Sequence, residues 1–364
     1  MSSKLLSPLR LGALTLPNRV IMAPLGRARA DLETREPLPR VVTYYVQRAS
    51  AGLIISEATH VAPESVSRPG TAAIHNARQV QAWRQVTDAV HAAGGRIFQQ
   101  LFHLGRKADP GRMPAGEWPA APSEIAALGE VSTPAGPRPF PVPRALSLAE
   151  IAARVAAFGE AARQAQLAGF DGVEIHAANG FLIDQFLRDG SNRRSDAYGG
   201  SIPARARFLL EVVDAAIEVF GRERVGVRVS PHFNVDGSHD STPRETFGYV
   251  AAQLDRRGVA YLHLIEPVST PASERLAPAL RERYRGPLIL CGGFDRRTAE
   301  RALDSEQADL IAFGVGYIAN PDLVERLRTD APWNPPDTET FYSGGDRGYI
   351  DYPFLPAAQS GAEE

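Results

Sequence analysis

Eight short apolar runs alternate with longer amphipathic segments along the chain, and this alternation restricts its possible folds most strongly. Each run is apolar enough to be buried on both faces, which is typical of parallel sheets with helical crossovers. Between the runs, apolar residues recur every three or four positions, the period of an amphipathic helix. The expected strands are Arg19–Met22, Leu53–Ser56, Arg96–Leu101, Gly172–His176, Val225–Ser230, Tyr261–Ile265, Pro287–Cys291 and Leu310–Phe313. The expected helices include Gln79–Ala93, Ala149–Ala168, Ala204–Phe220 and Pro243–Arg257.

Eight is the number of parallel strands that, with intervening helices, closes into a barrel. We therefore expect an α/β protein, a (β/α)₈ TIM barrel, in one domain over residues 1–355. An open doubly wound sheet is the alternative, but polar residues follow nearly every strand instead of gathering at one crevice. A proline-rich excursion at about 106–147, between the third and fourth strands, is expected to act as a lid, with a poorly ordered surface loop as the alternative. Residues 356–364 are expected to form a disordered tail.

The composition of the chain excludes several classes of binding partner. A formal net charge of −2 argues against binding to nucleic acid or to an anionic membrane, because both need a basic surplus. No apolar run reaches the roughly 20 residues that span a bilayer, and the first residues lack a signal-peptide pattern. The single cysteine, Cys291, excludes an internal disulfide. We expect a cytoplasmic protein that acts on a small molecule, as a monomer or homodimer.

Barrel active sites lie at the carboxyl ends of the strands, and several residues there suggest a ligand. Glycines follow the seventh strand (Gly292, Gly293) and the eighth (Gly314), where backbone N–H groups commonly bind a phosphate. Tight turns without a ligand would need the same glycines. Arg228 lies within an otherwise apolar strand, and a buried arginine without a partner is costly. Gln100 can both donate and accept hydrogen bonds, which suits the edge of a heteroaromatic ring.

His176 and Asn179 follow the fourth strand at the spacing of one helical turn. Two neutral donors that converge on one point suit an oxygen that gains negative charge during a reaction. A structural histidine and a helix-capping asparagine are the alternative interpretation. Cysteine or carboxylate clusters at ligand spacing do not accompany the pair, so no metal is expected.

These residues belong to longer stretches that resemble the old yellow enzyme family of FMN-dependent ene-reductases, also called NADH:flavin oxidoreductases. The similar stretches include "LLSPLRLGALTLPNRVIMAPL", "HAAGGRIFQQLFHLGR", "GFDGVEIHAANGFLIDQFLRDGSNRRSDAYGG", "VGVRVSP" and "IAFGVGYIANPDLVERL". The resemblance covers nearly the whole chain.

The resemblance implies FMN as the cofactor and NAD(P)H as its reductant. The flavin would be lined by Ala23, Pro24, Leu25, Gly26, Ala58, Gln100, Arg228, Gly292, Gly293, Gly314 and Val315. In this arrangement Gln100 would bond the pyrimidine edge and Arg228 would face the N1/O2 end. His176 and Asn179 would hold the carbonyl or nitro oxygen of the substrate, and Tyr349 would belong to a C-terminal aromatic wall of the pocket.

Five positions depart from the pattern of the family. Phe181 replaces the tyrosine that donates a proton to the substrate, and Gly26 replaces a threonine or cysteine near flavin O4. In the substrate pocket, Phe102 replaces a tryptophan and Arg68 a tyrosine. Val315 replaces an arginine beside the phosphate, which predicts weakened FMN binding.

The function that we expect is reduction of the activated C=C bond of an enone, enal or nitro compound, by hydride transfer from flavin N5. Because Phe181 cannot donate a proton, redox-neutral isomerisation or desaturation at the same FMN site is an alternative. A barrel that has lost its catalytic activity and serves as a binding protein is a third reading. The preference for NADH or NADPH and the physiological substrate stay open.

Overall fold

The computed structural model describes residues 3–66, 68–133 and 136–356. Eight parallel strands form a closed ring in the order β11-β12-β13-β14-β15-β3-β4-β6, and β6 pairs back with β11. The ring consists of β3 (Val20–Met22), β4 (Leu53–Ile55), β6 (Ile97–Phe102), β11 (Gly172–Ala177), β12 (Val225–Val229), β13 (Tyr261–Ile265), β14 (Leu288–Cys291) and β15 (Leu310–Phe313). A short strand, β5 (Thr59–His60), extends the pairing of β6. The expected (β/α)₈ barrel is confirmed.

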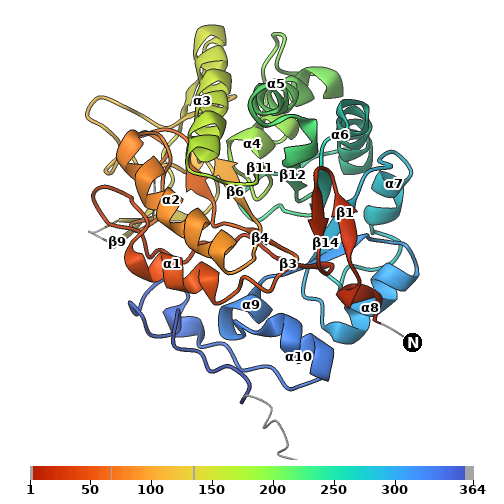
Figure 1. Ribbon diagram of the computed structural model, residues 1–364. Helices are drawn as coiled ribbons and strands as arrows, with labels where there is room; N and C mark the ends of the chain where they lie inside the picture. Colours follow the sequence, from red (N-terminus) through yellow and green to blue (C-terminus); the bar gives the residue numbers. More distant parts are fainter. Residues whose placement is uncertain (1–2, 67, 134–135, 357–364) are drawn as a thin grey trace, which may run out of the picture.

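Helices follow each strand and surround the ring (Figure 1). They are α1 (Pro39–Val46), α2 (Ala77–Ala92), α3 (Leu148–Leu167), α4 (Leu182–Leu187), α5 (Ile202–Phe220), α6 (Pro243–Arg257), α7 (Ala277–Arg281), α8 (Arg296–Asp304), α9 (Val315–Ala319) and α10 (Leu323–Thr329). Local capping sets their starts: at α3 the Ser147 hydroxyl accepts from the Glu150 N–H, and the Glu150 carboxylate accepts from the Ser147 N–H. The four helices expected from the sequence are confirmed, with bounds within two residues.

A hairpin that the apolar pattern did not indicate covers the amino-terminal end of the barrel. It is formed by β1 (Leu9–Leu11) and β2 (Leu14–Leu16), which pair antiparallel. Its leucines are buried against side chains inside the barrel such as Ile289 and Leu310. The hairpin is joined to the 3-10 turn just before β12 by a bond from the Ala13 N–H to the Glu223 carbonyl. This end of the barrel is thereby filled, and the opposite end carries the cavities.

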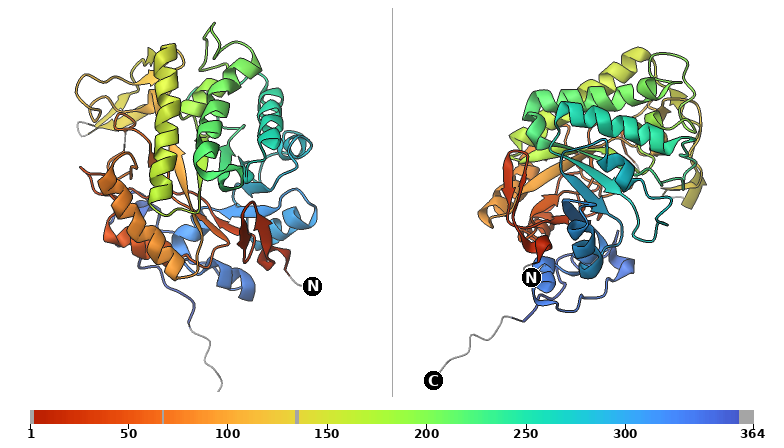
Figure 2. Two further views of the ribbon diagram at one scale, coloured as in Figure 1. Left: turned by 45° about the horizontal axis from the view of Figure 1, so that its top comes forward. Right: turned by 90° about the vertical axis from the view of Figure 1, so that its right-hand side faces the viewer.

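The excursion between β6 and α3 contains regular structure. It holds β7 (Ala120–Ala121), β8 (Glu130–Thr133), β9 (Gly136–Pro139) and β10 (Arg144–Ala145), with β8 and β9 forming a hairpin at one side of the barrel (Figures 1 and 2). At its start, buried Arg106 donates to the Ser238 hydroxyl and the Asp236 carbonyl, which attaches the segment to the loop after β12. Phe140 lines one of the cavities described below, so the segment contributes to the site. A closing motion of this segment stays a prediction.

The chain after α10 returns beside α1 (Figure 1). The Gln47 side chain donates to the Ile350 carbonyl, and Arg27 donates to the Gly348 carbonyl. The single-domain assignment stays a prediction, and all of the expected tail except Pro356 lies outside the described residues. Within the described part of the chain, helices with the length and apolarity needed to cross a membrane are absent.

Candidate active site

Two cavities lie at the carboxyl ends of the barrel strands, and Pro24 and Arg228 line both of them. The first, of about 550 Å³, is called the glycine cavity here, and its lining includes Ala23, Leu25, Gly293, Gly314 and Val315. The second, of about 350 Å³, is called the aromatic cavity, and its lining includes Gly26, Ala58, Arg68, Gln100, Phe102, His176, Asn179 and Phe181. The structure therefore brings most of the expected site residues together. Gly292 lies just outside both linings, in a turn so tight that a Cβ would sit 2.1 Å from the Glu266 carbonyl oxygen.

Arg228 is the cationic group at the junction of the two cavities. Its side chain projects from β12 and is 6% exposed, and Nη2 contacts the Cys291 sulfur at 3.6 Å. Its Nε is buried without a hydrogen-bond partner among the described residues. Because an unsatisfied buried guanidinium N–H is costly, this arrangement is suited to a bound acceptor. The electron-rich edge of a flavin provides such acceptors, so the residues present fit FMN.

Gln100 belongs to a buried polar chain that the sequence did not indicate. Its amide nitrogen donates to Glu174 Oε1 at 2.6 Å, and Glu174 Oε2 contacts His263 Nδ1 at 2.8 Å. Burial alone would raise the pKa of Glu174, but His263 first, and then Arg228 and Gln100, stabilise the carboxylate, so the pKa is lowered. The ionised Glu174 holds the Gln100 amide in one orientation, as expected for a side chain that binds the edge of a ring. Glu174, a charged residue inside the apolar strand "GVEIH", is the one sequence feature that could have pointed to this network.

The glycine cavity is built for close approach of backbone to a ligand. Gly293 has φ +88°, which favours glycine, whereas a Cβ on Gly314 would make only an ordinary contact with the Leu25 side chain, at 3.6 Å. Gly314 also precedes the first turn of α9. Val315 is 52% exposed and lines the cavity, and its apolar side chain offers the ligand no charge. Asp295, Asn320 and Trp333 also line this cavity and were not expected from the sequence.

His176 and Asn179 both line the aromatic cavity, although they do not share a helical turn. His176 is the fifth residue of β11, whereas Asn179 lies in the following turn with φ +59°. Asparagine tolerates this left-handed conformation better than most residues. Burial first, then the positive charges of Arg228, His263 and Lys107, lowers the pKa of His176 well below its usual range. The imidazole is therefore neutral at pH 7 and can act as a hydrogen-bond donor without carrying charge.

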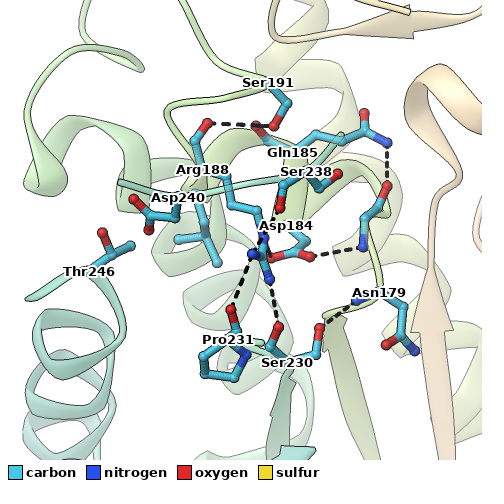
Figure 3. A network of polar contacts seen from close by, with 12 residues as sticks. Asn179, Asp184, Gln185, Arg188, Ser191, Ser230, Pro231, Ser238, Asp240 and Thr246 are labelled. Carbon is cyan, nitrogen blue, oxygen red and sulfur yellow. Dashed lines mark hydrogen bonds and ion pairs between the residues drawn. The ribbon is translucent and has the colours of Figure 1, made fainter. Parts of the chain in front are cut away.

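A buried ion pair holds the turn that carries Asn179 (Figure 3). The Asn179 N–H donates to the Ser230 hydroxyl at 2.8 Å, and the next N–H, of Gly180, donates to Asp184 at 2.8 Å. Arg188 pairs with Asp184 at 2.7 Å and donates to the Ser230 carbonyl, so it connects α4 to the end of β12. The position of the Asn179 side chain therefore depends on contacts between two neighbouring strand ends.

Comparison with known proteins agrees with this geometry. Residues 4–334 match the model of the NADH:flavin oxidoreductase / NADH oxidase family. The chain belongs to this family. It is 43% identical to a probable flavin mononucleotide-dependent alkene reductase of Leishmania infantum, over 96% of this chain and 97% of that protein. It is 40% identical to 12-oxophytodienoate reductase 2 of Arabidopsis thaliana, over 97% and 96%.

Among solved structures, morphinone reductase in complex with tetrahydroNAD superimposes with a TM-score of 0.94 at 48% identity, covering 98% of this chain and 99% of that one. Membership of the NADH:flavin oxidoreductase family makes this chain an FMN-dependent oxidoreductase with a reduced nicotinamide nucleotide as reductant.

Phe181 lies where the family resemblance places a proton donor. Its ring packs edge-on against His176, with centroids 5.0 Å apart, and against Phe102 at 5.1 Å. His60, which was not expected at the site, stacks on Phe102 with ring centroids 4.5 Å apart. Aromatic rings therefore surround His176 on this side, and Phe181 itself has no acidic hydrogen to donate to a substrate.

The C-terminal wall of the pocket requires a correction. Tyr349 is buried outside the residues that line the aromatic cavity, because its ring stacks on Tyr44 at 4.2 Å and lies 5.2 Å from the Arg27 guanidinium. Tyr342 lines the cavity instead, and the Arg68 guanidinium lies 3.9 Å from its ring centroid. Cation–π contacts with buried arginines favour the inward position of Tyr349, and they could not be read from the order of the two tyrosines.

Proposed function

We propose that this protein reduces the activated C=C bond of α,β-unsaturated carbonyl or nitro compounds. The observation that carries the proposal is the pair of neutral donors, His176 and Asn179, in a cavity that shares Arg228 and Pro24 with the FMN site. When bound and reduced by NAD(P)H, FMN supplies a hydride from N5 to the β-carbon of the alkene. The two donors bind the substrate oxygen and stabilise the negative charge that develops on it.

The neutral state of His176 supports this role. A charged imidazolium would also bind carboxylates and other anions, whereas a neutral imidazole and an amide recognise a polarised oxygen. Removal of one donor to a developing oxyanion typically lowers the rate by about 10²–10³-fold. We therefore expect His176→Ala and Asn179→Ala to slow the reaction with an enone by a factor in this range, while the loaded flavin is retained.

The names of the relatives support the same substrate class. One is an alkene reductase, and another reduces 12-oxophytodienoate, a compound with an oxo group and a diene. A small-molecule enone or enal is accordingly the substrate class that we propose here.

Phe181 supports a second candidate function. Without a hydroxyl at this position, the enolate formed from an enone can persist and return its hydride. The net result is isomerisation of the double bond or, in the reverse direction, desaturation. The two candidates differ in whether the flavin is oxidised in the process.

Anaerobic mixing of the pre-reduced, FMN-loaded enzyme with an enone separates them. Stoichiometric oxidation of the flavin supports reduction, whereas turnover of substrate with the flavin still reduced supports isomerisation. The variant Phe181→Tyr is the matched comparison, and it is expected to accelerate flavin oxidation if reduction is the native reaction. Failure of any enone to oxidise the flavin or to change chemically would refute both candidates.

A further inference from the structure

Lys107 is a charged side chain in the aromatic cavity that the reaction described so far leaves unused. It ends the short 3-10 helix Gly105–Lys107, which directly follows β6, and its side chain is 17% exposed. Its ammonium forms an ion pair with Asp236 at 2.9 Å and donates to the Asn179 carbonyl at 3.2 Å. Lys107 is thus connected by its own contacts to the turn that carries Asn179.

The ammonium also lies against the ring that replaces the usual proton donor. Its nitrogen is 5.0 Å from the ring centroid of Phe181 and 5.3 Å from that of Phe233. Phe181 in turn contacts His176, and all three side chains of Lys107, Phe181 and His176 line the same cavity. The ammonium has three N–H groups, and the contacts with Asp236 and Asn179 use two of them.

We propose that Lys107 donates the proton that completes reduction of the alkene, at the α-carbon of the substrate. The proposal rests on the proposed function. Hydride addition to the β-carbon leaves an enolate whose oxygen is held by His176 and Asn179. An N–H bond of the Lys107 ammonium then breaks, a C–H bond forms at the α-carbon, and the carbonyl double bond is restored. The neutral amine then takes a proton from water, which restores the ammonium.

The chemistry of the two acids supports the substitution. In water an alkylammonium group and a phenol have similar acid strength, with pKa values of about 10.4 and 10. A lysine therefore provides an acid comparable to the tyrosine that this chain lacks. Its flexible stem allows the ammonium to move toward the substrate while the backbone stays in place.

A purely structural role for Lys107 would be to hold the Asn179 turn through the Asn179 carbonyl. Two substitutions distinguish the roles. Lys107→Met removes the acid and the hydrogen bonds, whereas Lys107→Arg keeps the positive charge and the donors but is a far weaker acid. Each substitution is made once with the native Phe181 and once together with Phe181→Tyr, which restores a hydroxyl beside His176. Flavin absorbance verifies FMN loading in every variant.

The experiment measures flavin oxidation by cyclohexenone in a single anaerobic turnover of the pre-reduced enzyme. Loss of a general acid is typically worth about 10²–10⁴-fold, so both Lys107→Met and Lys107→Arg are expected to oxidise their flavin at least about a hundredfold more slowly than the wild type. Phe181→Tyr is expected to recover at least tenfold of the rate in the Lys107→Met background. The dissociation constant of cyclohexenone for the oxidised enzyme, followed by flavin absorbance, is expected to change less than about threefold.

A second readout reports the position of the donor. Reduction of 2-methylcyclohexenone creates a stereocentre at the α-carbon, so a fixed donor gives an excess of one enantiomer. Lys107→Met is expected to lose this excess, because water then protonates from either face. A wild-type rate in Lys107→Arg, or no recovery with Phe181→Tyr, would overturn the proposal while leaving the ene-reductase activity intact. A wild-type enzyme whose flavin no enone oxidises would instead overturn the proposed function, and this inference with it.

Discussion

Val315 gives the wall of the glycine cavity an apolar side chain where the resemblance to the family implies an arginine. Replacing Val315 by arginine tests whether the phosphate of FMN lies beside this residue. Val315 is the first residue of α9 and is 52% exposed at the cavity wall. Asp295, on the same wall, accepts a bond from the Thr298 N–H at 2.7 Å. Hydrogen bonds from the Thr298 side chain and backbone lower the pKa of Asp295, so this carboxylate is charged at pH 7 and repels a phosphate.

The expected effect of Val315→Arg follows from the interaction that it adds. A hydrogen bond to a charged group contributes about 1.5–3 kcal/mol. The position is half exposed and lines the same cavity as Asp295, so solvent screening and competition from this carboxylate place the gain near the lower limit. At about 1.4 kcal/mol per decade, we expect FMN to bind about tenfold more tightly. The stability of the FMN-free protein is expected to change by less than about 0.5 kcal/mol, as for most surface substitutions.

Titration of the FMN-free protein, with quenching of flavin fluorescence as the signal, measures the dissociation constant. Riboflavin is the matched ligand, because it has the same ring and no phosphate, and Val315→Met is the matched uncharged variant. The gain is expected for FMN in Val315→Arg alone, and it should shrink as salt is raised. Equal tightening for riboflavin, or no change for FMN, would show that the phosphate does not lie beside residue 315.

Three further outcomes are expected. Gly293→Ala should weaken FMN binding in the same titration, because φ +88° is strained for alanine, and an unchanged dissociation constant would place the phosphate elsewhere. Burial raises the pKa of Glu57 from 4.5 to about 7, despite the opposing Arg27 and Arg29, so folding disfavours its charged form. Relative to Glu57→Gln, the free energy of unfolding of the wild type should therefore fall as pH rises from about 4.5 to 7, by about 3 kcal/mol in total. Urea unfolding of both proteins at pH 5 and pH 8 measures this, and a difference between them that is the same at both pH values would refute it. Gly172→Ala should lower the free energy of unfolding by about 1–3 kcal/mol, because its Cβ would lie 2.3 Å from the Arg224 carbonyl oxygen and 2.4 Å from the Phe98 ring. An unchanged urea midpoint would show that the strand can shift without cost.

The barrel was predictable from the sequence because its strands and helices have local signatures. A strand buried on both faces needs a continuous apolar run, and an amphipathic helix needs a period near four, whatever lies next to it. The residues that follow each strand were predictable for the same reason, since a closed parallel barrel places all carboxyl ends at one face. Thus Arg228, Gly293, Gly314 and His176 were identified before their neighbours were known.

Contacts between segments far apart in the chain were not predictable in this way. Glu174 pairs with Gln100 and His263 only because β6, β11 and β13 come together in the closed ring. Lys107 reaches Asn179 and Asp236 across two loops, and its place against Phe181 has no signature in the order of residues.

The sequence alone therefore determined the fold and the identity of most groups at the barrel mouth, since these depend on periodicity and on residue type, and its resemblance to a known family implied the cofactor. The tertiary structure decided which of Tyr342 and Tyr349 borders the cavity, how the Asn179 turn is held, and which acid lies beside Phe181. The physical reason is that the orientation of a side chain is set by hydrogen bonds, ion pairs and ring contacts with remote residues. These form only when the eight strands have closed.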